Sequence, residues 1–254
     1  MSLFLHLAAA VFASLVWSVL AMSLMRAAGV DLKNVTGAFT PRAIAIAAIS
    51  YALILATTLA LAFALDSLTP DALGFRLDGA SAALAVGEVA LTLTMLSGFV
   101  ALLRRWLGSA PAEARAKRRL LAVPLLVGGA LWEEALYRGY FLSLLRPMGF
   151  TLSIAVSAGA FTAIHFVTSK GTALRALNWL VGGFALAFIY LDSKSIWVAT
   201  AAHFGRNLGN ALVLIPGSGV TVVSFRRPVP EWVRTAWYVV LSIATVALAH
   251  FAER

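Results

Sequence analysis

The sequence predicts an all-α protein, a polytopic membrane helical bundle with about eight transmembrane helices. The chain has 254 residues, of which 61% are hydrophobic and only 12% are charged. A soluble domain of this size carries about twice that charged fraction. Apolar runs of roughly 20 residues, the length that crosses a bilayer as a helix, recur along the whole chain. The connections between them are short and contain no repeat, so residues 1–254 are predicted to form a single integral membrane domain.

Eight apolar segments account for this bundle. The first begins at Leu3 and is expected to be a retained span, because no basic segment precedes it and no cleavage site follows it. Thr40 and Pro41 are typical of the N-cap and first position of a helix, and they start the second segment. Pro124 is expected to kink the fourth segment or to mark where it enters the bilayer. The stretch Thr69 to Leu77 is too short to span and is expected at the interface. The predicted spans are about 3–25, 41–65, 79–103, 120–145, 150–168, 174–191, 195–214 and 231–251.

The distribution of basic residues predicts the orientation. The odd-numbered connections hold thirteen Lys and Arg residues and the opposite side holds four, and basic residues favour the cytoplasm. We therefore expect a multi-pass protein of the cell membrane with both termini outside. The net charge of +9 favours contacts with anionic membrane lipids. Nucleic acid is not an expected partner, because no basic and aromatic surface remains outside the spans. The chain has no cysteine, which excludes disulfides, thiolate metal sites and a cysteine nucleophile.

Three predicted spans carry ionisable or strongly polar side chains at membrane depth. The fourth span contains the sequence EEALYR at 133–138, the fifth contains FTAIH at 161–165, and the seventh contains HFGRN at 203–207. Charged groups in a bilayer cost several kcal/mol, so such residues are functional candidates. Glu88 in the third span is interpreted as structural, either paired with Arg206 or lining a cavity.

Helix geometry separates the two adjacent glutamates of the fourth span. Glu134 and Arg138 are four residues apart, so they stack on one helix face and can pair. Glu133 points about 100° away and has no partner at helical spacing. An isolated carboxylate in an apolar setting holds a proton more tightly than one in water, which suits a general base near neutral pH. We therefore predict a structural role for Glu134 and a chemical role for Glu133.

The two other motifs supply hydrogen-bonding groups for the same chemistry. His203 and Asn207 lie one turn apart, and two converging donors can stabilise the oxyanion of a tetrahedral intermediate. His165 is positioned to orient or polarise a water held by Glu133. A base, a water-positioning group and an oxyanion site together form the set needed to hydrolyse a peptide bond. The Ser-His-Asp, GxSxG and HExxH patterns are absent.

These motifs, in this order on successive spans, resemble those of the CPBP family. EEALYR matches EExxxR, FTAIH matches FxxxH, and HFGRN matches HxxxN. That family groups the type II CAAX prenyl endopeptidases with bacterial Abi and bacteriocin-processing relatives. The resemblance covers roughly residues 70–215, because LGFR at 73–76 also resembles a segment before the family's core. Arg206 departs from the small or apolar residues typical of its position.

The resemblance implies an intramembrane endopeptidase that acts on a membrane-embedded or membrane-tethered peptide or protein substrate. The implied roles fall on the following residues: Glu133 as base, Glu134 and Arg138 as a supporting pair, His165 on the water, and His203 with Asn207 at the oxyanion.

Other interpretations of the same residues stay open. The charged cluster is also compatible with an ion-pair network, His165 with a buried histidine bonded to a carbonyl, and His203 with Asn207 as interhelical hydrogen bonds. The alternative functions are a catalytically silent scaffold of the same fold and a proton-coupled transporter, although the inverted repeats of many transporters are absent. No cofactor is expected. Zinc on Glu133, His165 and His203 is the alternative, and it is disfavoured because Glu133 cannot easily be both a metal ligand and the base.

Overall fold

The computed structural model describes residues 3–30, 40–110, 116–168, 171–214, 221 and 223–252. Within these ranges the protein is almost entirely helical, and its helical segments correspond one to one to the predicted spans. The predicted all-α bundle is therefore confirmed. The exception is a two-residue antiparallel pair, in which β1 (Ser109–Ala110) pairs with β2 (Ser224–Phe225). Neither strand was indicated by periodicity, because two residues are too short to establish an alternation.

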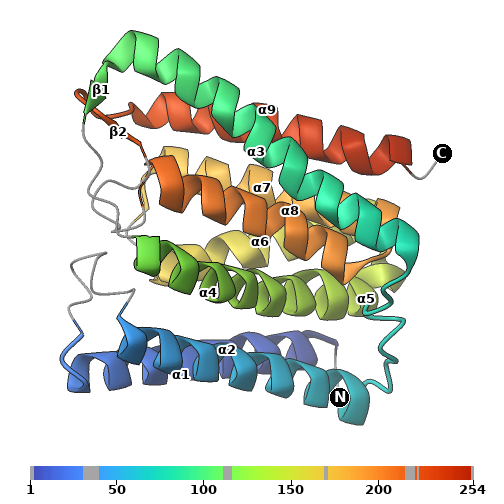
Figure 1. Ribbon diagram of the computed structural model, residues 1–254. Helices are drawn as coiled ribbons and strands as arrows, with labels where there is room; N and C mark the ends of the chain where they lie inside the picture. Colours follow the sequence, from blue (N-terminus) through green and yellow to red (C-terminus); the bar gives the residue numbers. More distant parts are fainter. Residues whose placement is uncertain are drawn as a thin grey trace.

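The N-terminal half of the bundle contains three long apolar helices. They are α1 (Leu3–Ala27), α2 (Pro41–Ala60) and α3 (Gly79–Leu107), and α2 continues as a π-helical turn, Leu61–Leu65. The predicted start of α2 is confirmed, because the Thr40 side chain accepts a hydrogen bond from the Ala43 amide and Pro41 occupies the first turn. Figure 1 shows α1 and α2 as a layer on one side of the bundle.

The second half carries the three motifs. It comprises α4 (Ala116–Glu134), a π-helical segment (Ala135–Phe141), α5 (Leu142–Leu145), a short 3-10 turn (Arg146–Met148), α6 (Phe150–Thr168), α7 (Ala173–Ser193), α8 (Ile196–Gly209), a π-helical turn (Asn210–Leu214) and α9 (Glu231–Ala252). Pro124 lies inside α4, where its ring removes one backbone hydrogen bond.

Five helices of the described chain are long and apolar enough to cross a membrane. They are Leu3–Ala27, Pro41–Leu65, Gly79–Leu107, Ala173–Ser193 and Glu231–Ala252, and α6 adds a shorter apolar helix. Large apolar side chains on their outer faces are open to the surroundings, as at Phe12, Val86 and Phe251, each more than two-thirds exposed. Such a surface requires lipid around it. The chain is therefore a multi-pass integral membrane protein.

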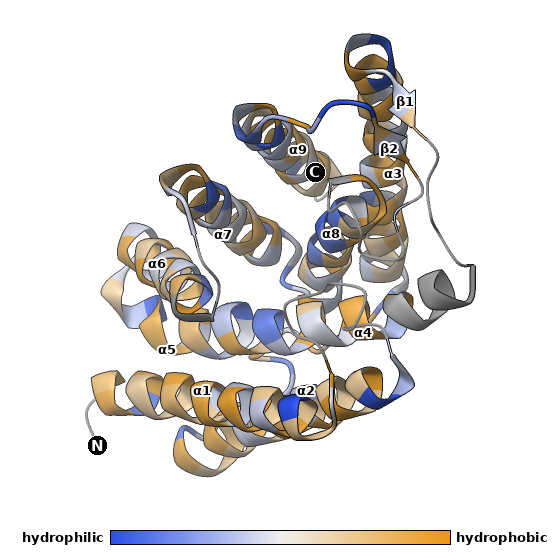
Figure 2. Cartoon of the chain, turned by 90° about the vertical axis from the view of Figure 1, so that its left-hand side faces the viewer, coloured by the Kyte–Doolittle hydropathy of each residue, from blue (hydrophilic) through white to orange (hydrophobic). Residues whose placement is uncertain are grey.

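The two helices that carry most of the polar motifs are held inside the bundle. α8 packs against α3, α4 and α7, and α4 packs against α2 and α8. In Figure 2 the more polar α8 is surrounded by helices with apolar outer faces. These neighbours separate the charges of α4 and α8 from lipid, which explains how two helices of lower hydropathy sit in a membrane protein.

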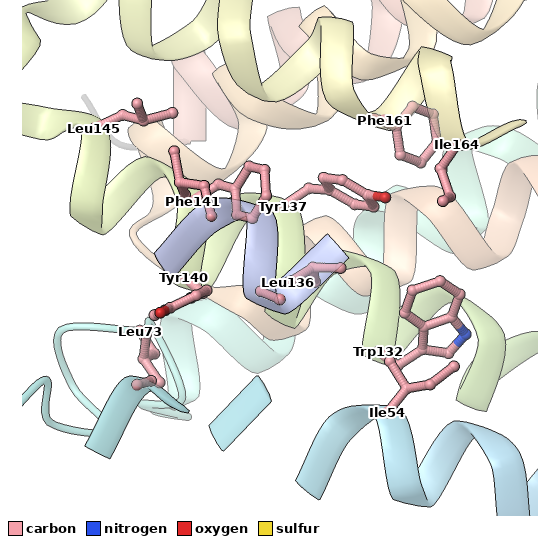
Figure 3. Packing of buried hydrophobic residues seen from close by; sticks show 13 residues of the cluster. Ile54, Leu73, Trp132, Leu136, Tyr137, Tyr140, Phe141, Leu145, Phe161 and Ile164 are labelled. Carbon is pink, nitrogen blue, oxygen red and sulfur yellow. The ribbon is translucent and has the colours of Figure 1, made fainter. Parts of the chain in front are cut away.

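The largest buried cluster surrounds the π-helical segment. All seven residues of Ala135–Phe141 are buried. Figure 3 shows Tyr137, Tyr140 and Phe141 packed among side chains from α2, α4 and α6. A π-helical turn leaves some carbonyls without the usual helical partner, and here the Ser157 hydroxyl of α6 donates to the Tyr137 carbonyl at 2.7 Å. The packing fixes the segment that follows Glu133 and Glu134.

We predict the orientation from the basic residues, and cysteine labelling tests it. The natural chain has no cysteine, so single substitutions can be labelled without background. Ser109→Cys lies on the predicted cytoplasmic side and Ser67→Cys on the outer side, and both positions are exposed. A membrane-impermeant thiol reagent should modify Ser67→Cys in intact cells, and should modify Ser109→Cys only after permeabilisation. The reverse pattern would contradict the orientation. A third position suited to this test, Ser218, lies outside the described residues.

Candidate active site

The candidate site contains a buried ion pair formed by Glu134 and Arg138. Both side chains have no exposed surface, and Arg138 Nη1 lies 3.1 Å from Glu134 Oε1. Arg138 Nη2 donates to the Gly183 carbonyl of α7 at 3.2 Å. The guanidinium carbon also lies 4.6 Å from the centre of the Phe161 ring, a favourable cation–π distance. The pairing predicted from the four-residue spacing is confirmed.

His203 connects the two glutamates. Its Nδ1 lies 2.7 Å from Glu134 Oε1, where a carboxylate can only accept, so Nδ1–H donates when Glu134 is ionised. Its Nε2 lies 3.8 Å from Glu133 Oε2. Sequence spacing indicated a partnership of His203 with Asn207 and did not indicate this contact. α8 therefore presents the imidazole between the carboxylates of Glu133 and Glu134.

His165 approaches Glu133 from α6. Its Nδ1 lies 2.8 Å from the Phe161 carbonyl. A carbonyl oxygen only accepts, so Nδ1 carries a hydrogen, and in the neutral ring Nε2 is left as an acceptor. That Nε2 lies 3.9 Å from Glu133 Oε2. The hydrogen bond to a carbonyl, considered above as a purely structural interpretation, is thus present and also sets which nitrogen faces Glu133.

Glu133 Oε2 is the atom on which the two histidines converge. It makes no hydrogen bond within the described chain, and separations of 3.8 and 3.9 Å from His203 and His165 exceed direct hydrogen-bond range. Such separations suit two polar groups that share a water molecule. Glu133 is thus available for chemistry, while Glu134 bonds to both Arg138 and His203 through Oε1 and keeps only a buried Oε2 without a partner in the described chain.

Asn207 does not join this cluster directly. It lies one turn beyond His203 on α8 and is partly buried, and no described residue hydrogen-bonds to its side chain. Its oxyanion role stays a prediction. Arg206, the unusual residue of the same motif, is buried on α8 and donates to Thr245 of α9 at 3.3 Å. Glu88 is fully buried, and it forms no ion pair with Arg206 or with any other residue that the structure describes.

A pocket opens beside Glu133 between the α1–α2 layer and α6. Its volume is about 220 Å³. Most of its wall is apolar, and Glu133, His165, Ser50 and Tyr51 supply polar groups. Ten side chains besides Glu133 line it: Ser18, Ala21, Met22, Met25, Ala47, Ser50, Tyr51, Trp132, Ile164 and His165. The contribution of α1 and α2 was not predicted, because their polar lining residues, Ser18, Ser50 and Tyr51, lie within long apolar runs and belong to no motif.

Two further polar groups near Glu133 were missed by motif analysis. The Trp132 indole N–H and the Tyr137 hydroxyl are buried and have no hydrogen-bond partner in the described chain. In Figure 3 the Tyr137 hydroxyl is directed toward the Phe161 side of the cluster, where His165 and His203 also pack. Their position within and beside EEALYR was the only available signal, and an aromatic residue in a helix usually means packing.

The donor set of Glu133, His165 and His203 has the chemistry of a zinc site but not its spacing. Ligands of a tetrahedral zinc at about 2.1 Å lie about 3.4 Å apart, whereas the Glu133 oxygen lies 3.8 and 3.9 Å from the imidazole nitrogens. Among the described residues, no group of three or more histidine, cysteine, aspartate or glutamate side chains meets the distances for a metal ion. The positions of these side chains therefore do not fit a bound zinc.

Comparison with protein families gives a match in the second half of the bundle. The model of the family described as type II CAAX prenyl endopeptidase Rce1-like matches residues 116–209. Comparisons with curated proteins and with solved structures gave no match. The matched region runs from α4 to α8 and contains all three motifs. This confirms the resemblance carried by the motifs and supports a protease of the membrane. Through this region the chain is similar to the Rce1-like family of type II CAAX prenyl endopeptidases.

Proposed function

We propose that the protein is an intramembrane endopeptidase that hydrolyses a peptide bond of a membrane-embedded or membrane-tethered substrate with a water activated by Glu133. One observation carries the proposal. Of two adjacent glutamates, one is held by Arg138 and His203, and the other directs an unbonded oxygen between two histidine nitrogens at the wall of a pocket.

Glu133 and His165 together suit the capture of a water molecule. Glu133 Oε2 and the unprotonated Nε2 of His165 are both acceptors, and a water between them donates one hydrogen to each. This arrangement directs a lone pair of the water away from both residues and toward the pocket. As the water attacks a carbonyl carbon, its proton passes to Glu133, which can then give it to the leaving amine.

His203 suits the stabilisation of negative charge. Glu133, Glu134 and Arg138 together carry one net negative charge when all are ionised, and a protonated His203 makes the cluster neutral. In that form both ring nitrogens donate: Nδ1 to Glu134, and Nε2 toward the substrate. Asn207, one turn further along α8, adds an amide donor whose hydrogen bonds are not used by other described residues. The two groups then share the developing oxyanion.

Glu134, Arg138 and Phe161 form a rigid support for the site, which we call the frame. The ion pair, the bond to the Gly183 carbonyl and the stacked ring hold α4, α6 and α7 together at the level of Glu133. A base and an oxyanion donor must keep their separation within a fraction of an ångström for catalysis. The frame supplies this rigidity inside an apolar bundle.

The position of the pocket supports access from the membrane. Its wall combines Met22 and Met25 of α1 with Ile164 of α6, and the α1–α2 layer faces lipid on its other side. A substrate segment with apolar flanks can reach Glu133 between these helices without crossing a charged surface. A lipid-modified tail and a transmembrane segment both satisfy this requirement.

We predict that Glu133→Gln removes activity and leaves the fold intact. The substitution keeps the side-chain volume and removes the base, so cleavage should fall by at least about 10²-fold. Mass spectrometry of peptides from membranes with wild-type or Glu133→Gln protein measures cleavage and identifies the substrate at the same time. Near wild-type turnover by the variant would exclude Glu133 as the base. No cleaved peptides from membranes with the wild-type protein would favour the silent scaffold.

Glu134→Gln is expected to have a different main defect. It leaves the Arg138 charge buried without its partner, a loss of about 3–5 kcal/mol, and it also removes the acceptor of His203. Yield and thermal stability in detergent should both fall, measured beside Glu133→Gln as the matched control. A stable, inactive Glu134→Gln together with an unstable Glu133→Gln would reverse the two roles.

Elemental analysis of active, detergent-purified protein separates the metal-free mechanism from the zinc alternative. We expect well below one zinc per chain, and activity that survives chelation, because Glu133 serves as the base and not as a ligand. About one zinc per chain, with activity lost on chelation and restored by zinc alone, would assign Glu133, His165 and His203 as ligands. Mutagenesis of these residues cannot make the distinction, since both mechanisms require all three.

A further inference from the structure

A second pocket lies away from the candidate active site, where α5, α6 and α7 end or begin. Its volume is about 580 Å³. Arg146 follows α5, and Lys194 follows α7, and both line this pocket together with Asp71. All three side chains are exposed, and none forms an ion pair with another described residue. We call this cavity the Arg146 pocket.

The charge of the Arg146 pocket is unusual for its side of the membrane. Few basic residues lie on that side of the membrane, and two of the four, Arg146 and Lys194, meet here. Lys194 also holds a left-handed backbone conformation with φ 50° at the C-terminus of α7. This conformation ends α7, and the Lys194 N–H donates to the Tyr190 carbonyl.

Apolar groups continue from the charged rim into the membrane. Phe150 at the start of α6 and Leu191 of α7 line the Arg146 pocket. Phe150 packs against Phe188 with 5.8 Å between ring centres, and both rings are exposed at the surface of the bundle. The pocket is therefore cationic at the helix ends and apolar toward the bilayer.

We propose that the Arg146 pocket binds the headgroup of a phospholipid that carries a phosphate and a primary ammonium group, as in phosphatidylethanolamine. Arg146 and Lys194 pair with the phosphate, and Asp71 accepts from the ammonium. Two cations and one carboxylate match this zwitterion better than they match a purely anionic headgroup, for which Asp71 is repulsive. The acyl chains follow the Phe150 and Phe188 surface. A soluble phosphoethanolamine shares the headgroup chemistry but gains nothing from that surface.

Native mass spectrometry of the full-length, delipidated protein in detergent tests the proposal. Phosphatidylethanolamine, phosphatidylglycerol, phosphatidylcholine and soluble phosphoethanolamine are each added at the same concentrations. We expect one phosphatidylethanolamine to bind the wild-type protein roughly tenfold more tightly than the other lipids, the usual scale for one well-placed charged contact. Equal binding of the three lipids, or full competition by equimolar phosphoethanolamine, would overturn the assignment.

Three variants make the test specific. Arg146→Gln with Lys194→Gln should weaken phosphatidylethanolamine and phosphatidylglycerol alike by at least about tenfold. Asp71→Asn should remove only the preference for phosphatidylethanolamine. Arg76→Gln is the matched control, because Arg76 is exposed on the same side and pairs with Asp78 outside the pocket, and it should leave lipid binding unchanged.

Thermal unfolding without added lipid confirms that the variants are folded, as expected for exposed, unpaired side chains. If the double variant does not fold, Asp71→Asn decides alone. Unchanged lipid preference in Asp71→Asn, or wild-type binding by a folded double variant, would contradict the proposed site.

Discussion

The burial of Arg138 is the constraint on which the rest of the structure depends. A guanidinium with no exposed surface has to find every partner within the protein, and its partners come from four directions: Glu134 on its own segment, the Gly183 carbonyl on α7, the Phe161 ring on α6 and, through Glu134, His203 on α8. Each partner fixes one helix. Loss of Glu134 would leave the Arg138 charge unpaired in an apolar interior, and the other contacts hold the neighbouring helices at the level of this ion pair.

The contacts of the buried Arg138 explain why the two neighbouring glutamates differ in their chemistry. One carboxylate oxygen of Glu134 bonds to both Arg138 and His203, so the charge of Glu134 is neutralised and its position is fixed. Glu133 precedes Glu134 by one residue, so its side chain points in another direction and lines the pocket. There the nitrogens of His165 and His203 lie beyond hydrogen-bond distance of its carboxylate. A lone glutamate in the same helix would have to stabilise the structure and perform the reaction at once. The doubled glutamate separates the two tasks within one helical turn.

The sequence was sufficient for features that depend on local spacing and insufficient for those that depend on the packing of distant helices. Apolar length predicted the helical segments, Thr40 and Pro41 predicted the start of α2, and the four-residue spacing predicted the Glu134–Arg138 pair. His203 was expected beside Asn207, because only the helical neighbour is visible in sequence, yet its Nδ1 bonds to Glu134 across two helices. The hydrogen bond between His6 and Asp66, 60 positions apart, escaped prediction for the same reason. So did the pocket wall from α1 and α2, whose apolar residues carry no periodic signal distinct from lipid contact.

The polar site also depends on a small residue at the point where α6 and α7 cross closely. A Cβ at Gly183 would lie 3.1 Å from Cα and Cβ of Ala158 on α6, so only glycine lets the two backbones approach without displacement. That approach brings the Gly183 carbonyl within reach of Arg138, and it keeps α6, with Phe161 and His165, near the π-helical segment that follows α4. In a membrane, where apolar burial gives little force between helices, close backbone contact and interhelical hydrogen bonds provide the attraction. Gly183 therefore provides both at one position: its missing side chain allows the contact, and its carbonyl accepts the hydrogen bond that helps to neutralise the buried charge.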